Sequence, residues 1–543
     1  MNVNFLTDNG RTLALPFTVI ALTTLVGSAP AFAQNTIVFS PGNLVVSRSV
    51  YDNNARTVTV GQTLPPNCTN SCVTATSNGT YPAVWNNALV DGSFGVTSKI
   101  ILDQVTPAGA LVSSQAVPSS VRLGPPVTKD ELVTSFSSKS EMSLNLSLDH
   151  KYLTFMGYVS PIDALDVSNS NTPREVDPTN PVGENAYRAV AQMDQFGRFQ
   201  FTETNAYSGN NGRAALLNSF GGVLYLAGNA GNGSNPQPDG IIIGAGAQIL
   251  NPVSEAESAQ DPGAPTPVGS FNVTQLGDAE DKIGKDDNFR GLTVFGNVLY
   301  YTKGSGGNGV NTVYFVDTTG TVCTDSHGVG LPVPGAALPA APMNYNPAVL
   351  QTEGLDPNNM CVLDGFPTAL KSSTSFPFGL WFANAKTLYV ADEGNGTNTY
   401  SNGMYTAAAS QATAGLQKWI FNSSSGTWSL AYTLQSGLNL GVPYTVANYP
   451  TGNNPATGLP WAPGTDGLRN ITGVVNTDGT ATIYAITSTV SGNGDQGADP
   501  NMLVAITDNL AATTLPSAES FTTVRSAGFG EVLRGVAFAP GTM

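Results

Sequence analysis

Four arginines occupy the same place in four similar stretches of this sequence. The stretches read NGRAALL, NFRGLTVF, GLRNITGVV and LRGVAFAPG, and they contain Arg213, Arg290, Arg469 and Arg534. Each arginine stands just before a short apolar run, and Lys139 stands at a comparable place before SEMSLNLSL. If these runs are strands that start at one end of the fold, the cationic side chains converge there. Converging guanidinium groups are a receptor for carboxylate or phosphate.

Acidic residues near these arginines support two other interpretations. Asp287, Asp466 and Glu531 each lie three residues before an arginine. Each acid could pair with its own arginine and brace the loop, because structural ion pairs also cluster charges. Together with Asn288 the acids also offer the carboxylate and amide oxygens that calcium prefers, although the neighbouring arginines oppose a cation. The residues alone leave all three interpretations open.

Candidate catalytic side chains are few. His327 lies in a long loop and is a hypothetical general base, since an imidazole titrates near neutral pH. Tyr400 and Tyr405 lie in another long loop and are alternative groups for moving a proton. Asp392 and Glu393 are weaker candidates for a carboxylate pair, because adjacent loop side chains diverge.

The arginine stretches belong to a repeat. Its copies at 211–233, 288–309, 376–396 and 467–494 contain two apolar strands, a tight turn and a loop with Gly-Asn-Gly. A weaker copy is present at 140–158, and a lone first strand at 533–541. A second pair of strands follows most copies, so the unit has four antiparallel strands, here lettered a to d. Repeats of this kind are typical of β-propellers.

One copy also resembles a known family. FPFGLWFANAKTLYVADEGNG (376–396) resembles the repeat of NHL and SMP-30/gluconolactonase-like proteins. The resemblance implies a propeller more than an activity, because this fold carries lactonases, lyases and binding modules alike. It also implies an axial metal, for which calcium is the candidate. We predict an all-β fold, a β-propeller of six four-stranded blades, or seven if an insertion hides one. The N- and C-terminal strands should share a blade and close the ring.

The predicted topology distinguishes the two ends of the propeller. Strands alternate in direction within a blade, so the b–c and d–a connections leave from one end. We assign five long insertions to that end: 53–97, 159–185, 324–376, 392–415 and 435–467. Long loops on a rigid scaffold often bind ligands, so this is the predicted functional face, and strand a with its arginine starts there. Trp85, Trp461 and the loop tyrosines could instead stack on glycans.

Other features place the protein outside the cytoplasm. Residues 1–33 combine Arg11, an apolar run and Ala31-Phe32-Ala33, which predicts a secretory signal peptide before a single propeller domain at 34–543. No later segment is apolar enough to span a membrane. We therefore expect secretion, to the extracellular space or the periplasm, with disulfides Cys68–Cys72 and Cys323–Cys361.

Charge excludes some partners and leaves three functions. The net charge of −16 repels nucleic acid and anionic lipid. The favoured prediction is a secreted propeller that binds an anionic small molecule or acidic carbohydrate at the channel mouth, with lyase or lactonase/hydrolase activity if it is an enzyme. The alternatives are a non-catalytic glycan- or protein-binding propeller and a calcium-dependent propeller.

Overall fold

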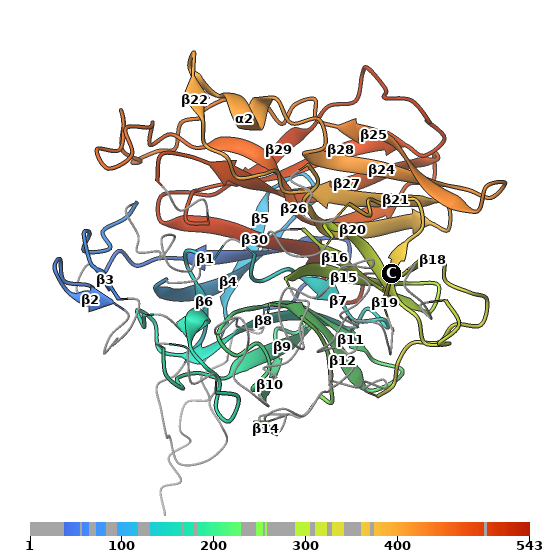
Figure 1. Ribbon diagram of the computed structural model, residues 1–543, viewed down its shortest axis with the longest axis horizontal. Helices are drawn as coiled ribbons and strands as arrows, with labels where there is room; N and C mark the ends of the chain where they lie inside the picture. Colours follow the sequence, from blue (N-terminus) through green and yellow to red (C-terminus); the bar gives the residue numbers. More distant parts are fainter. Residues whose placement is uncertain are drawn as a thin grey trace, which may run out of the picture. The chain divides into compact units, whose positions relative to one another are not determined.

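The computed structural model describes residues 37–54, 57–64, 72–82, 95–117, 131–138, 140–165, 167–176, 180, 182–229, 246–252, 256–257, 288–304, 310–322, 328–341, 360–369, 374–493 and 497–542. The chain separates into Met1–Thr36 and Ile37–Met543, and every described residue belongs to the second unit. This part is built from β-strands (Figure 1), with a four-residue helix α2, Thr406–Ala409, and a 3-10 turn at Val167–Asn169. The all-β prediction is confirmed. The predicted signal peptide lies outside the described residues.

Three four-stranded antiparallel units follow one another along the second half of the chain. They consist of β15 (Phe289–Phe295), β16 (Val298–Lys303), β17 (Thr312–Val316) and β19 (Met360–Leu363); β20 (Pro377–Asn384), β21 (Thr387–Asp392), β24 (Gly415–Asn422) and β25 (Thr427–Leu434); and β26 (Gly464–Val475), β27 (Thr480–Val490), β28 (Met502–Asn509) and β29 (Thr522–Ser526). The two-residue strand β18 (Val329–Gly330) adds in parallel to β19. Tight turns such as Gly296–Asn297, both with positive φ, join a to b, as hairpins require.

A fourth unit combines the two ends of the described chain. The C-terminal strand β30 (Glu531–Phe538) pairs with the N-terminal strand β1 (Leu44–Val50), and β4 (Thr97–Val105) and β5 (Leu111–Ala116) complete the sheet. The pairing of terminal strands is thus as predicted. The described chain has a propeller-like arrangement of these four-stranded units.

Most of the remaining strands lie between β5 and β15 in the sequence. An antiparallel set comprises β7 (Asn145–Leu146), β8 (Tyr152–Ser160), β9 (Arg188–Asp194) and β10 (Phe199–Thr204), and another comprises β11 (Gly212–Asn218), β12 (Val223–Gly228) and β13 (Ala247–Leu250). Strand β6 (Glu131–Ser135) links β4 to β8, and β14 (Ala256–Glu257) adds to β10. Two loop hairpins are β2 (Thr63–Leu64) with β3 (Val73–Thr74), and β22 (Tyr400–Ser401) with β23 (Met404–Tyr405).

The first strands of successive units lie against one another. Neighbouring pairs are β7 and β11, β11 and β15, β15 and β20, β20 and β26, and β26 and β30. The contacts include a bridge between Ser143 and Ala214, and a bond from the Val536 N–H to Asn470 Oδ1 (2.6 Å). We call these six strands the inner strands and the space between them the channel.

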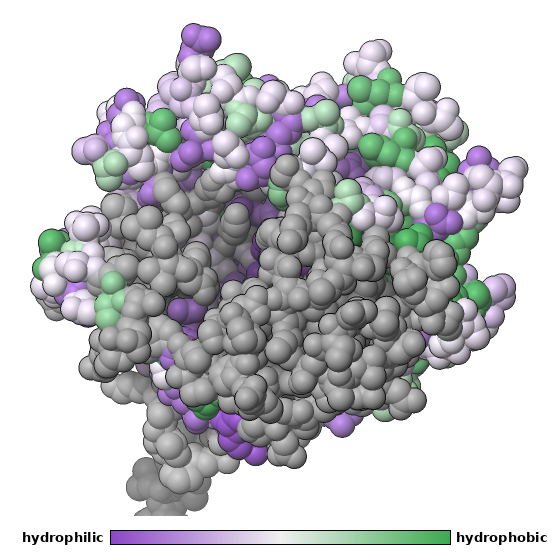
Figure 2. All heavy atoms as spheres, viewed as in Figure 1, coloured by the Kyte–Doolittle hydropathy of each residue, from purple (hydrophilic) through white to green (hydrophobic). Residues whose placement is uncertain are grey.

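The hydrophobic core lies between neighbouring sheets. Phe295 of one sheet, for example, stacks on Phe382 of the next with ring centroids 4.6 Å apart. On the outside, Figure 2 shows polar and apolar residues mixed, with apolar residues (green) gathered at the upper right, where Figure 1 places β24 and β25. Leu430 of β25 is among the exposed large hydrophobic residues. Each sheet therefore buries its faces against its neighbours and exposes its outer strands.

Glycine allows the inner strands to approach closely. A Cβ on Gly291 would lie 2.4 Å from the Phe378 carbonyl oxygen, and a Cβ on Gly379 would lie 2.6 Å from the Arg469 carbonyl oxygen. Real side chains do not approach backbone oxygens this closely. The glycine that follows the arginine in NFRG, and its counterpart in FPFG, is therefore a packing requirement at this level of the channel.

We expect Gly379→Ala to lower the free energy of unfolding by about 1–3 kcal/mol, because the new methyl group forces two backbones apart. Gly183→Ala is the matched control, since a Cβ there meets nothing within 4 Å and the backbone is not left-handed. Urea unfolding of both variants measures the difference. Equal stabilities for the two variants would contradict this account of the inner strands.

One predicted insertion is on the wrong face. The described residues 328–341 lie between β17 and β19, which are strands c and d of their unit, so this connection leaves from the end of the a–b turns. The described part agrees, because Tyr225 beside an a–b turn donates a hydrogen bond from its hydroxyl to the Pro339 carbonyl (2.6 Å). Only the residues after β19 connect strand d to the next strand a. The described residues 328–341, which were assigned with all of 324–376 to the long-loop end, therefore lie at the other end, and His327 lies outside the described residues.

Two of the four cysteines fall within the described residues. Cys72 and Cys361 are each disulfide-bonded. Their predicted partners, Cys68 and Cys323, lie outside the described residues, so the pairing stays a prediction. No helix within the described ranges is long and apolar enough to cross a membrane.

Candidate functional site

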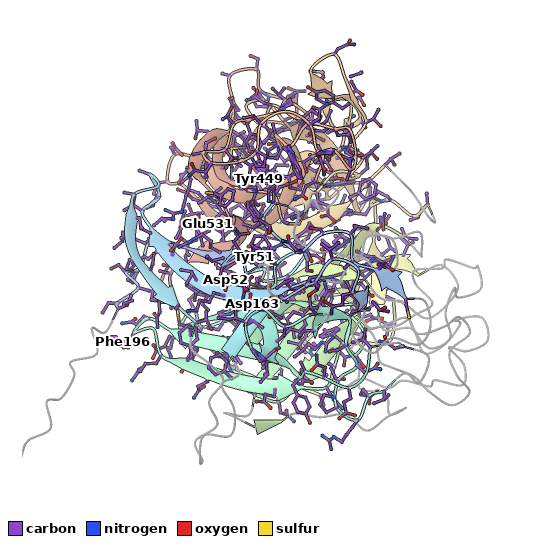
Figure 3. All side chains as sticks on the ribbon, turned by 90° about the vertical axis from the view of Figure 1, so that its left-hand side faces the viewer. Tyr51, Asp52, Asp163, Phe196, Tyr449 and Glu531 are labelled. Atoms are coloured by element: carbon purple, nitrogen blue, oxygen red, sulfur yellow. The ribbon has the colours of Figure 1, made fainter. Side chains whose placement is uncertain are left out.

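Long loops form a packed layer at the end where the inner strands begin. Tyr51, Tyr81, Phe136 and Tyr449, from three different connections, are buried together in one cluster. The Tyr81 ring meets the rings of Phe136 and Tyr449 at 5.9 and 5.6 Å. Figure 3 shows Tyr449 and Tyr51 one above the other in this layer, with Glu531 beside them. These loop aromatics are used for packing, so they do not present the stacking surface that a glycan would need; Trp461 packs against the same cluster, and Trp85 lies outside the described residues.

The four predicted arginines are all buried, with 3–4% of each residue exposed. Arg534 donates from Nε to Ser49 Oγ (3.0 Å), and its two terminal nitrogens donate to the carbonyl oxygens of Ser138 and Phe136. Arg213 donates to Asn211 Oδ1 (3.0 Å), Asn288 Oδ1 (2.5 Å) and the Phe289 carbonyl (3.0 Å). These two arginines brace the loops, and the oxygens they use are mostly neutral.

Arg290 and Arg469 are different because they share one carboxylate. Glu393 lies 3.5 Å from Arg290 Nη2 through Oε1 and 3.3 Å from Arg469 Nε through Oε2. Burial lowers the pKa of Arg290, Glu393 raises it and the charge of Arg469 lowers it. The Arg290 guanidinium also lies 5.9 Å from the centroid of the Phe378 ring, which occupies the position of the arginine in its own strand.

One end of Arg469 is available to a ligand. Its Nε is the nitrogen that donates to Glu393, and within the described part of the chain no group hydrogen-bonds to Nη1 or Nη2. The residue is nevertheless only 4% exposed. A buried guanidinium has a strong preference for an acceptor, and its two terminal nitrogens match the two oxygens of a carboxylate.

The predicted pairing of each acid with its own arginine is wrong for the two acids that the structure describes. Asp466 accepts hydrogen bonds from the Gly396 N–H (2.8 Å) and from Gln411 Nε2 (2.7 Å). Glu531 accepts from Arg48 Nη1 (2.5 Å) and the Gly528 N–H (3.0 Å). Arg469 and Arg534 find partners on other strands instead.

The four predicted calcium ligands are not assembled in the described part of the molecule. Asp287 lies outside it, Asn288 accepts from Arg213, and Asp466 and Glu531 face the separate donors just named. No group of three or more His, Cys, Asp or Glu side chains with metal-binding geometry occurs among the residues described. Lys139 also lies outside them. Near it, Glu141 is buried and accepts from Thr134 Oγ1 (2.5 Å), the Ser135 N–H (3.0 Å) and the Tyr158 hydroxyl.

The predicted proton-transfer residues are not gathered at the arginines. Tyr405 is fully buried, and its hydroxyl lies 3.0 Å from the Pro460 carbonyl and 2.9 Å from the Ala462 carbonyl, which accept its hydrogen bond. Burial raises its pKa well above the ordinary tyrosine value. Tyr400 packs edge-on against it at 5.1 Å. The pair therefore holds the loop 460–462 in place, and His327 lies outside the described residues.

Asp392 and Glu393 diverge, as expected of adjacent loop residues. The Asp392 carboxylate accepts from the Phe376 N–H (2.8 Å), the Gly394 N–H (3.0 Å) and Gln417 Nε2 (3.2 Å). Burial raises its pKa to about 7, assisted by the charges of Glu393 and Asp466 and opposed by the two backbone hydrogen bonds. Asp392 organises the loop after β21, whereas Glu393 faces the arginines.

Asp392 predicts a specific pH dependence of stability. Its folded-state pKa of about 7 lies above the ordinary value of 3.8, so its contribution is complete below about pH 4 and is lost as the pH rises to about 7. We expect the free energy of unfolding of the wild type, minus that of Asp392→Asn, to fall over this range by up to about 1.4 kcal/mol per pH unit. Urea unfolding at several pH values measures it, with exposed Glu184→Gln as control. Parallel curves for wild type and Asp392→Asn would contradict the shift.

Comparisons with known proteins do not assign a family. No family model and no curated protein matches the chain. Similar solved structures include a protein from Lactobacillus plantarum, with 10% identity, a TM-score of 0.31 and coverage of 80% of this chain and 81% of that one. Another is a mutant apocarotenoid oxygenase from Synechocystis, with 8% identity, a TM-score of 0.21 and coverage of 82% of this chain and 59% of that one. Extracellular domains of Drosophila Semaphorin 1a match with 9% identity, a TM-score of 0.24 and coverage of 76% of this chain and 83% of that one. TM-scores this low support neither a family nor an activity.

Proposed function

We propose that this protein is an exported six-bladed β-propeller that binds a small carboxylate- or phosphate-bearing molecule, such as an acidic sugar, where its inner strands begin. The observation that carries the proposal is the guanidinium of Arg469, which is buried beside Glu393 while Nη1 and Nη2 have no hydrogen-bond partner in the described ranges. An anion there would satisfy both nitrogens in a partly dry site, where charge-assisted hydrogen bonds are strong.

Ring closure and blade number are part of the proposal. The six inner strands support six blades, one of which contains β11, β12 and β13. Closure is supported by contact of β30 with the segment before β7, since a Cβ on Gly535 would lie 2.4 Å from the Met142 carbonyl oxygen. The NHL or SMP-30-like kinship remains a proposal based on residues 376–396, and secretion to the extracellular space or periplasm remains one based on residues 1–33.

Ligand binding is tested by thermal shift and calorimetry of the purified protein with galacturonate, glucuronate, inorganic phosphate and a neutral lactone. A ligand at about 100 times its Kd raises the free energy of unfolding by about 2.7 kcal/mol. We expect stabilisation by at least one anion, its loss in Arg469→Gln, and its retention in Arg198→Gln, whose side chain is 73% exposed. Stabilisation that persists in Arg469→Gln, or no anion that stabilises the wild type, would reject the site.

Two further experiments distinguish the calcium-dependent propeller and an enzyme from a propeller that only binds an anion. A fall in stability with EDTA that calcium reverses would favour the calcium-dependent propeller. Product analysis with any anion that binds then decides between binding and lyase or lactonase chemistry. The proposed anion binding depends only on Arg469 and the residues around it and does not require a catalytic group.

A further inference from the structure

The opposite end of the channel contains a second, chemically different site. A cavity of about 400 Å³ opens there among the inner strands. Every inner strand contributes to its wall, through Leu146 of β7, Leu216 of β11, Phe295 of β15, Trp381 of β20, Val474 of β26 and Phe538 of β30. This volume is within the range of small-molecule sites in proteins, about 300–1,000 Å³.

The cavity is separate from the arginine site. Phe295 and Val474 follow Arg290 and Arg469 by five residues in the same strands, which corresponds to roughly 16 Å along an extended chain. Between the two levels the strands approach so closely that Gly291 and Gly379 have no room for a Cβ. A ligand that binds at one end of the channel therefore makes no contact with the site at the other end.

The cavity wall is neutral. None of the described residues that line it is Asp, Glu, Lys or Arg, although the protein as a whole carries a net charge of −16. A charged ligand would lose its hydration there and gain no counter-ion, so an uncharged ligand is favoured. Polar and apolar groups contribute about equally to the wall, and the apolar part would stabilise binding in proportion to the apolar area removed from water.

The aromatic side chains of the wall are held by packing before any ligand arrives. The Phe295 ring stacks on Phe382 at 4.6 Å, and the Trp381 ring stacks on Tyr389 at 5.9 Å. Gly473 lies against the Trp381 ring, where a Cβ would come within 2.7 Å of it. Trp381 and Phe295 remain partly exposed to the cavity. A preformed aromatic wall favours a flat ring, because stacking needs no rearrangement.

A few polar groups could orient such a ring. Thr293 and Thr472 line the cavity, and within the described ranges neither hydroxyl has a hydrogen-bond partner. At the rim, His150 Nδ1 lies 2.6 Å from the Thr542 carbonyl oxygen. A carbonyl only accepts, so Nδ1 carries the hydrogen, and Nε2 of the neutral ring is left as an acceptor.

We propose that this cavity binds an uncharged small molecule that contains an apolar planar ring and a hydroxyl or carbonyl group. The six surrounding strands enclose the space from the sides, so it fits a small molecule better than a peptide. The ring would lie against Trp381 and Phe295, and the polar group would meet a threonine hydroxyl or His150. This site does not depend on the anion site.

Naphthol is the probe for the test, because it is flat, carries one hydroxyl and is uncharged at neutral pH. Isothermal titration should give saturable binding of one naphthol per chain. Thr472→Phe and Thr293→Phe each place a ring in the cavity, and each should weaken binding by about tenfold or more. Thr507→Phe adds the same ring at an exposed strand position and should leave affinity unchanged. Because there are two variants that fill the cavity, the test remains possible if one of them does not fold.

Three results would overturn the proposal. The first is that naphthol shows no saturable binding to the wild type, and the second is that it binds equally to the wild type and to a folded filling variant. The third is that the wild type self-associates in solution and Thr472→Phe abolishes this association, which would make this end of the channel a protein interface. Arg469→Gln should still bind naphthol, and Thr472→Phe should still bind the anion, so the two sites are tested independently.

Discussion

Replacing Lys418 by Met is expected to lower the free energy of unfolding by about 3–5 kcal/mol. The Lys418 ammonium and the Asp508 carboxylate are 2.8 Å apart, and neither side chain has any exposed surface. The ammonium also lies 2.7 Å from the Asn509 carbonyl and 3.0 Å from the Ala512 carbonyl. The variant leaves a buried carboxylate without its cation, and that cost exceeds the gain from burying a thioether.

The double variant Lys418→Met/Asp508→Asn identifies the cause of this loss. It removes both charges, so it should recover most of the stability. The Tyr389 and Tyr432 hydroxyls now donate to different oxygens of Asp508; in the double variant one of them keeps an acceptor in the amide oxygen, and the other can accept from the amide nitrogen. Lys386→Met is the control at an exposed turn. Chemical denaturation of the three variants and the wild type measures these differences in the free energy of unfolding. A loss below about 1 kcal/mol in the single variant, or no recovery in the double variant, would contradict a buried ion pair.

Replacing Glu393 by Ala is expected to cost about 3 kcal/mol, since it removes the carboxylate that two buried guanidinium groups share. Glu393 is 4% exposed and contacts Arg290 and Arg469 at 3.5 and 3.3 Å. The lost group is a carboxylate, and the space it leaves is the size of one. Formate or acetate should therefore bind there and restore part of the thermal stability as its concentration rises.

Chemical rescue makes this prediction specific to the site. Chloride at equal ionic strength should restore much less, because it cannot form two parallel hydrogen bonds with a guanidinium. Glu184→Ala, at an exposed position, should lose little stability and show no response to formate. A Glu393→Ala protein that is as stable as the wild type, or that responds equally to formate and chloride, would remove the basis for anion recognition by these arginines.

Much of the architecture follows from local patterns. The hairpins were predictable because alternation of apolar residues and Gly-Asn turns act over a few residues, as at Gly296–Asn297 between β15 and β16. The isolated first strand near the C-terminus predicted its pairing with the N-terminal strand, which β30 and β1 confirm. The repeated arginine lies near the start of β11 and β15, as predicted, but further inside β26 and β30.

The partners of the arginines were not predictable in this way. Sequence proximity suggested Asp466 for Arg469 and Glu531 for Arg534, but Arg469 pairs with Glu393, which is 76 residues distant, and Arg534 with groups near residues 49 and 136–138. The described residues 328–341 were assigned to the wrong end because their connection depends on whether the next strand, β19, is the fourth of one unit or the first of another. Local sequence carries no signal for that choice.

This sequence by itself determined the repeating strand pattern, because short-range sterics and side-chain alternation act along the chain. Only the tertiary structure shows which charges meet, which arginine has two terminal nitrogens without a hydrogen-bond partner among the described residues, and where a neutral cavity opens. Those features depend on side chains from strands far apart in sequence, and their burial creates the low-dielectric surroundings in which a single carboxylate or hydroxyl determines what binds.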